Sequence, residues 1–91
     1  MAREFISELK QEVGRGSTLA ALDLLNRSIR FKHKKLAIYR YLIAEQLGAA
    51  LSEEHHAYCR HVTQSLKHDE ISSLLVRVRQ FVEVHHLESV P

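Results

Sequence analysis

Apolar residues recur every three or four positions along almost the whole chain, and this spacing constrains the fold more than any other feature. It places the apolar residues on one side of an α-helix, whereas a half-buried strand needs apolar and polar residues to alternate. The one brief alternation, at residues 29–32, is too short to indicate a strand. The sequence therefore predicts an all-α fold, a small bundle of four to five short helices.

Each predicted helix has a candidate buried face formed by its apolar stripe. In chain order the faces are Ala2, Phe5, Ile6, Leu9 and Val13; Leu22, Leu25 and Ile29, widened by Ala21 and Leu24; Leu36, Tyr39, Ile43 and Leu47; His55, Cys59, Val62 and Leu66; and Ile71, Leu74, Leu75, Val78, Val82 and His85.

Glycine and capping residues mark where these helices should end. Residues 14–16 separate the first two helices, with Ser17 or Thr18 as the next cap, and Gly48 ends the third helix. Ser52 and Asp69 are expected to cap the last two helices. Residues 17–47 contain neither Gly nor Pro, so they form either one long helix or two helices with a bend near residues 31–33. The bend is favoured because the net positive charge of the segment weakens a continuous helix.

The length of 91 residues predicts one domain, residues 1–91, with a modest core. Helical proteins of this size often extend their core by dimerising, so a homodimer is expected. No apolar run approaches the ~18 residues that a membrane span needs, and the N-terminus lacks an apolar signal stretch. We therefore expect no membrane contact. The single cysteine cannot form an internal disulfide, so the expected compartment is the reducing cytoplasm.

Charge is divided unevenly along the chain. Residues 1–44 carry nine Lys or Arg against four Asp or Glu, whereas residues 45–91 carry four against seven. No acid lies between Asp23 and Glu45, and the basic residues of that gap are Arg27, Arg30, Lys32, Lys34, Lys35 and Arg40. Interleaved with aromatic residues, they have the composition of a nucleic-acid-contacting helix. The simpler interpretation is a solvated basic face, offset by the acidic half of the same chain or of a second copy.

Three of the seven histidines, His55, His56 and His61, lie close to the only cysteine, Cys59. His55 and Cys59 are four residues apart on one helix face, which suits a shared Zn²⁺. Two ligands are too few, so a metal or redox sensor would need a further ligand from another helix or a second copy. Because both residues also lie on the apolar stripe, a packing role is favoured.

A polar stripe follows the same predicted helix at a spacing of four and three: Glu54, Tyr58, His61, Ser65 and His68. Four of these residues, Tyr58, His61, Ser65 and His68, are candidate contacts for a partner protein. Protonation of the histidines would make such a contact dependent on pH. The simpler interpretation is an ordinary solvated face.

These features predict a small regulatory or interaction protein that binds another protein, acts as a homodimer, and needs neither enzymatic activity nor a cofactor. No acid–base pair or activated nucleophile can be placed with its partners, and no glycine-rich phosphate loop is present. Two alternatives stay open. One is a nucleic-acid-binding regulator using residues 27–40, and the other is a metal or redox sensor centred on His55 and Cys59.

Overall fold

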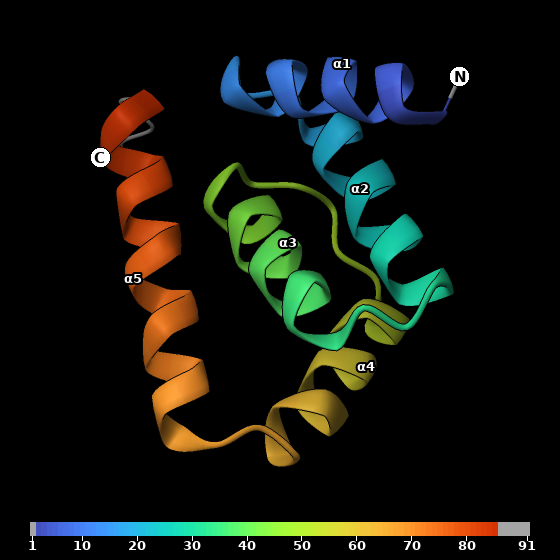
Figure 1. Cartoon of the computed structure of the whole chain (residues 1–91). Coiled ribbons are helices and arrows are strands. Elements are labelled where there is room, and N and C mark those ends of the chain that lie inside the picture. The colour runs from blue at the N-terminus through green and yellow to red at the C-terminus, as the bar shows by residue number, and fades with distance from the viewer. Residues whose placement is uncertain (1, 86–91) are drawn as a thin grey trace.

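A computed structural model of the chain describes the backbone of residues 2–85 and the side chains of residues 6–85, and it confirms the all-α prediction. Within this range there are five helices and no strand (Figure 1). The helices are α1 (Ala2–Gly14), α2 (Thr18–Arg30), α3 (Lys34–Gln46), α4 (Glu53–Gln64) and α5 (His68–His85). Two members of the first predicted stripe, Ala2 and Phe5, lie outside the described side chains. None of the described helices is both long and apolar enough to cross a membrane.

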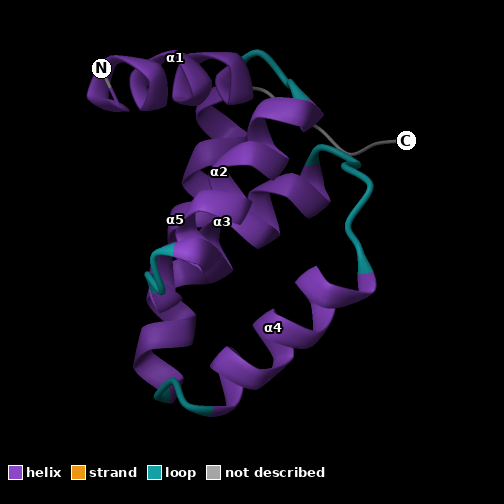
Figure 2. Cartoon of the chain, turned by 90° about the vertical axis from the view of Figure 1, so that its right-hand side faces the viewer, coloured by secondary structure: helices purple, strands orange, loops and turns teal. Residues whose placement is uncertain are grey.

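Helix α3 is the centre of the fold, because α2, α4 and α5 all pack against it (Figures 1 and 2). Helix α1 packs on α2 and lies across one end of the bundle. The radius of gyration is 12.7 Å, close to the ~12 Å expected for one compact domain of this length. A central helix must be apolar on several sides, and this explains why α3 buries residues all around its axis rather than along one stripe.

Two clusters of buried side chains make up the core. The larger cluster joins α1, α2, α3 and α5, and consists of Leu9, Val13, Ala20, Ala21, Leu24, Ile43, Ala44 and Val78. The smaller cluster joins α3, α4 and α5, and consists of Ile38, Cys59, Val62 and Leu74. Alanines supply much of the α2–α3 contact, and their small size lets the two helix axes approach closely.

The favoured bend within residues 17–47 is confirmed as a tight turn between α2 and α3. Phe31 caps α2 through its N–H, which donates to the Arg27 and Ile29 carbonyls, and Lys32 turns the chain with a φ of 59°. The Ser17 hydroxyl accepts the Ala20 N–H at 3.2 Å, so Ser17 is the α2 cap. Gly48 follows the end of α3 at a φ of 79°, a conformation that other residues rarely adopt.

Helix α5 begins at His68, so the prediction that Asp69 caps it is wrong. The Glu70 carboxylate accepts the N–H of Lys67, the residue before the helix, at 2.9 Å. This is one half of a capping box, and it leaves Asp69 inside the first turn.

The predicted faces of α2 and α5 are correct in part. On α2, Leu25 is buried but Leu22 and Ile29 are half-buried, because the buried face is centred on alanines and Ser28. On α5, Leu74 and Val78 are buried, whereas Leu75 and His85 are exposed. Phe81, absent from the predicted face, is half-buried instead. The buried face of α5 is therefore rotated about the helix axis from the predicted face, away from Leu75 and toward Phe81. Periodicity alone does not determine which side of a helix its neighbour covers.

Candidate functional site

His55 is a structural residue that joins α4 to α2. It is the third residue of α4, and its Nδ1 accepts the Ser52 N–H at 3.0 Å, while the Ser52 hydroxyl accepts the His55 N–H. Since Nδ1 is an acceptor, the ring proton lies on Nε2, which donates to the Asn26 Oδ1 of α2 at 2.7 Å. Both ring nitrogens therefore have partners within the fold.

Cys59 lies in the smaller core cluster with 3% of its surface exposed. Burial raises the pKa of its thiol to about 11, so at neutral pH the thiol is protonated and a weak nucleophile or ligand. Among the described residues no three His, Cys, Asp or Glu side chains gather where they could hold a metal ion. His55 and Cys59 share a helix face as expected, and no third candidate ligand from the described part of the chain joins them.

His56 joins α4 to α3, a role that the sequence did not indicate. The Tyr41 hydroxyl lies 2.6 Å from His56 Nδ1, and the two rings meet edge to face with centroids 5.6 Å apart. Burial raises the pKa of the Tyr41 hydroxyl, and the Glu45 carboxylate acts in the same direction. The hydroxyl is therefore protonated at neutral pH, and it donates to His56 Nδ1 in the tautomer that carries the ring proton on Nε2. Two adjacent histidines thus join α4 to two different helices, and their partners are too distant in the chain for spacing to reveal them.

The predicted contact stripe is divided between two helices. Tyr58 is half-buried against the smaller core cluster, and His61 is exposed on α4. Ser65 follows the end of α4, with its hydroxyl donating to the Val62 carbonyl at 2.8 Å, and His68 begins α5 after the turn. The expectation of one continuous helix face through His68 is therefore wrong, because the chain turns at residues 65–67.

The six basic residues of the gap do not form one exposed face. Arg27 Nε lies 3.0 Å from the Asp23 carboxylate, and Lys35 Nζ lies 2.5 Å from the Glu70 carboxylate of α5. Arg40 turns inward, with 9% of its surface exposed. Arg30, Lys32 and Lys34 are exposed near the α2–α3 turn. Composition identified a basic segment, but the turn and the packing of α3 give its members different surroundings.

Arg40 instead belongs to a pocket of about 250 Å³ at which α1, α2, α3 and α5 meet. Five basic side chains line this basic pocket: Lys10, Arg27, His33, Arg40 and Arg77. The Arg77 guanidinium carbon lies 4.6 Å from the Tyr39 ring centroid, and that of Arg40 lies 5.4 Å from the same centroid. Burial, and to a lesser extent the Arg77 charge, lowers the pKa of Arg40.

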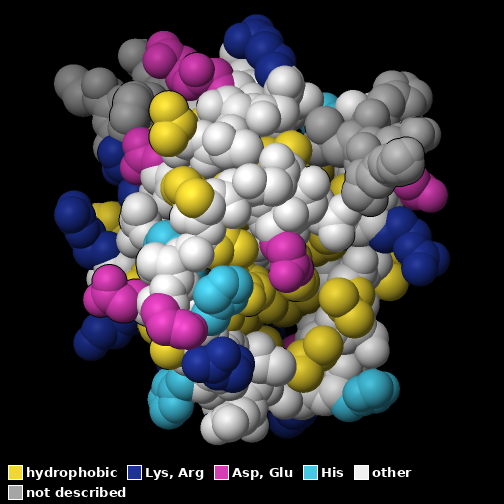
Figure 3. All heavy atoms as spheres, turned by 180° about the vertical axis from the view of Figure 1, so that it is seen from behind, with side chains coloured by type: hydrophobic (Ala, Val, Ile, Leu, Met, Phe, Trp, Pro, Cys, Tyr) yellow, Lys and Arg dark blue, Asp and Glu magenta, His cyan; other side chains and the backbone are white. Residues whose placement is uncertain are grey.

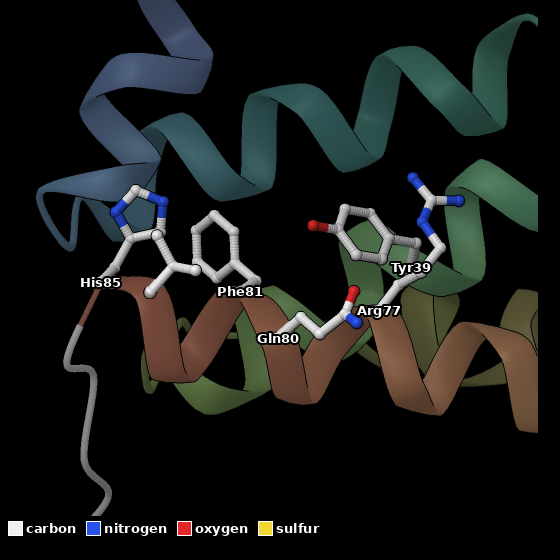
Figure 4. Close-up of a pocket in the computed structure, with 6 residues that line it drawn as sticks. Tyr39, Arg77, Gln80, Phe81 and His85 are labelled. Carbon is white, nitrogen blue, oxygen red and sulfur yellow. The ribbon is translucent and has the colours of Figure 1, made fainter.

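A second depression of about 270 Å³ lies beside the basic pocket along α5. Tyr39, Arg77, Phe81 and His85 line it, with Arg77 and Tyr39 next to each other and the two rings further along the helix (Figure 4). The Phe81 and His85 ring centroids are 4.4 Å apart. Arg77 lines both depressions, so one charged side chain on α5 connects them.

The opposite face of the molecule carries an apolar hollow. Seen from behind, hydrophobic side chains gather at the centre of this face, with histidine and acidic side chains close by (Figure 3). Leu42, Tyr58 and Leu66 are only partly covered where they pack on the smaller core cluster. On α5, Leu75 is 53% exposed although its neighbour Leu74 is buried in that cluster.

Comparison with models of known protein families, with curated proteins and with solved structures finds no match to this chain. Function must therefore be argued from the geometry of the chain's own residues. That geometry offers a basic pocket on one side of α3 and apolar surface on the other.

Proposed function

We propose that the protein is a small regulatory or interaction protein that acts by binding another protein, without catalysis, and that it forms a homodimer through the apolar hollow. The hollow on the rear face is the observation that carries the proposal (Figure 3). A small chain leaves much apolar surface uncovered, and a second copy of the same chain can cover it. Leu75 is the contact residue that we propose on α5, because about half of its surface is exposed and its neighbour Leu74 is buried in the smaller core cluster.

The charge distribution supports a second copy as the occupant. The N-terminal half is basic and the C-terminal half acidic, and Lys35–Glu70 is an ion pair that joins them within one molecule. Glu45, Glu53 and Glu54 have no ion-pair partner among the described residues. In a twofold dimer the same patch meets itself, so acidic and basic side chains at its edges can pair across the axis.

Sedimentation equilibrium across the micromolar range tests the dimer. Leu75→Glu should weaken association at least tenfold, because it places a carboxylate in an apolar contact. Leu19→Glu is the matched control: Leu19 is 78% exposed on α2, and the same substitution there should leave association unchanged. A strictly monomeric wild-type protein contradicts the proposed dimer. Dissociation by Leu19→Glu but not by Leu75→Glu would place the interface elsewhere.

A further inference from the structure

The basic pocket contains a buried positive charge that the described residues leave unpaired. Arg40 has no carboxylate partner among them, and its buried Nε has no hydrogen-bond partner. A buried charge without a partner is costly, and natural proteins rarely retain one unless something neutralises it. The Tyr39 ring offers Arg40 only the weaker attraction of an aromatic face.

Arg77 increases the need for an anion at this place. It reaches the same pocket from α5, so a second positive charge lies near Arg40, and this charge adds to burial in lowering the pKa of Arg40. Among the residues whose side chains the structure describes, none that lines the pocket is acidic, and the Glu70 carboxylate is paired with Lys35. Each guanidinium group is a planar set of donors of the kind that carboxylate and phosphate groups bind, and two such groups line this pocket.

The rest of the lining indicates what else the ligand carries. Leu24, Leu36 and Phe31 supply an apolar wall beside the charged groups. The volume of about 250 Å³ is below the usual range for pockets that hold drug-sized ligands. The pocket therefore suits a small molecule with one anionic group and a short apolar body, rather than a polymer.

We propose that the basic pocket is a binding site for a small organic anion, whose phosphate or carboxylate lies between Arg40 and Arg77 and whose apolar part packs against Leu24, Leu36 and Phe31. The site lies apart from the apolar hollow and does not depend on the dimer. Binding would supply the missing partner of Arg40 and would join α3 to α5 through the ligand.

Calorimetric titration with phenyl phosphate, at low salt, tests the proposal. We expect saturable binding of one molecule per chain, no binding of phenol under the same conditions, and weaker binding of inorganic phosphate. Arg77→Gln should weaken phenyl phosphate binding by about tenfold to a hundredfold, because it removes a charged hydrogen-bond donor. Arg79→Gln is the matched control, since Arg79 is also exposed on α5 but is outside the lining of the pocket, and binding should change less than about twofold.

Arg40→Met gives a second, independent measurement. It should abolish binding of phenyl phosphate while leaving the unliganded protein as stable as the wild type or more stable, because an unpaired buried charge is replaced by an apolar side chain. A merely structural arginine would instead lose stability on this change. Leu75→Glu should leave phenyl phosphate affinity unchanged, which separates this site from the proposed dimer.

Four results would overturn the proposal. The first is the absence of saturable phenyl phosphate binding at low salt. The second is equal weakening by Arg77→Gln and Arg79→Gln, which would indicate a diffuse basic surface. The third is tight, salt-sensitive binding of an RNA duplex that competes with phenyl phosphate, which would indicate the same. The fourth is equal affinity for inorganic and phenyl phosphate, which would show that the apolar wall makes no contribution to binding.

Discussion

The Cys59 thiol should react slowly in the native protein. With a pKa raised to about 11 by burial, it has on the order of a hundredfold less thiolate at pH 8 than an ordinary cysteine. Dithionitrobenzoate should therefore react with Cys59 far more slowly than it reacts with the thiol of glutathione, and unfolding the protein in urea should accelerate the reaction. A reaction of the native protein as fast as that of glutathione would show that the thiol is accessible to the reagent and would contradict its burial.

Other single residues have surroundings that the sequence pattern only partly indicates. The packing role favoured for His55 and Cys59 matches their positions, since His55 is bonded at both ring nitrogens and Cys59 is buried. The sequence does not distinguish Arg40 from the other basic residues, because composition records charge and not burial. Asn26 and Tyr41, the partners of the two α4 histidines, give no signal in the sequence, since a hydrogen bond across 29 or 15 residues leaves no mark on local spacing.

At the scale of elements, the sequence predicted which helices exist but not how each one faces its neighbours. The two-helix interpretation of residues 17–47 and the caps at Ser17, Gly48 and Ser52 are confirmed, because turns and caps depend on local chemistry. The sequence did not predict that α3 is buried on several sides, nor which side of α5 is buried. Both features depend on which helix occupies the centre of the bundle, and this is determined by the packing of all the helices rather than by any one segment.

The Lys35–Glu70 ion pair joins α3 to the start of α5 and should make stability depend on pH. Lys35 and the Lys67 N–H lower the pKa of Glu70, so its contribution is present above the ~4.3 of an unfolded glutamate and is lost as pH falls through the lower folded value. Urea unfolding should find Glu70→Gln less stable than wild type at pH 7, with the difference closing in acid. Glu83→Gln, at an exposed position of α5 without an ion pair among the described residues, should show no such trend.

Gly14 of α1 lies close to the His85 ring at the end of α5. A Cβ on Gly14 would lie 2.8 Å from His85 Cε1, and that ring also contacts Phe81. Alanine is favoured over glycine in a helix by up to about 1 kcal/mol, so Gly14→Ala should stabilise the protein more in a His85→Ala background than in the wild type. In the wild type the gain should be smaller, because the exposed imidazole must move aside. Thermal unfolding of the four variants measures this coupling, and equal gains in both backgrounds would contradict the contact.

For the whole molecule, the connectivity of the bundle implies an order of assembly. Helices α2 and α3 make the largest helix–helix contact and are joined by only three residues, so forming this pair closes a short loop. We expect it to be formed in the folding transition state, before α5 packs. Ala44→Gly should slow folding nearly in proportion to its loss of stability, whereas Val78→Ala should mainly speed unfolding. Stopped-flow measurements check this, and the reverse pattern would place α5 in the nucleus.

The central position of α3 has a consequence for the protein while it is being made. Ile38 and Leu42 of α3 are covered by elements that lie later in the chain, α4 and α5. During synthesis α2 and α3 emerge from the ribosome before α4 and α5, so one side of α3 is exposed until the later helices pack on it. Premature termination or proteolysis before His68 would leave this side of α3 permanently exposed. The truncated product would then present apolar surface that chaperones and other copies of the chain can bind.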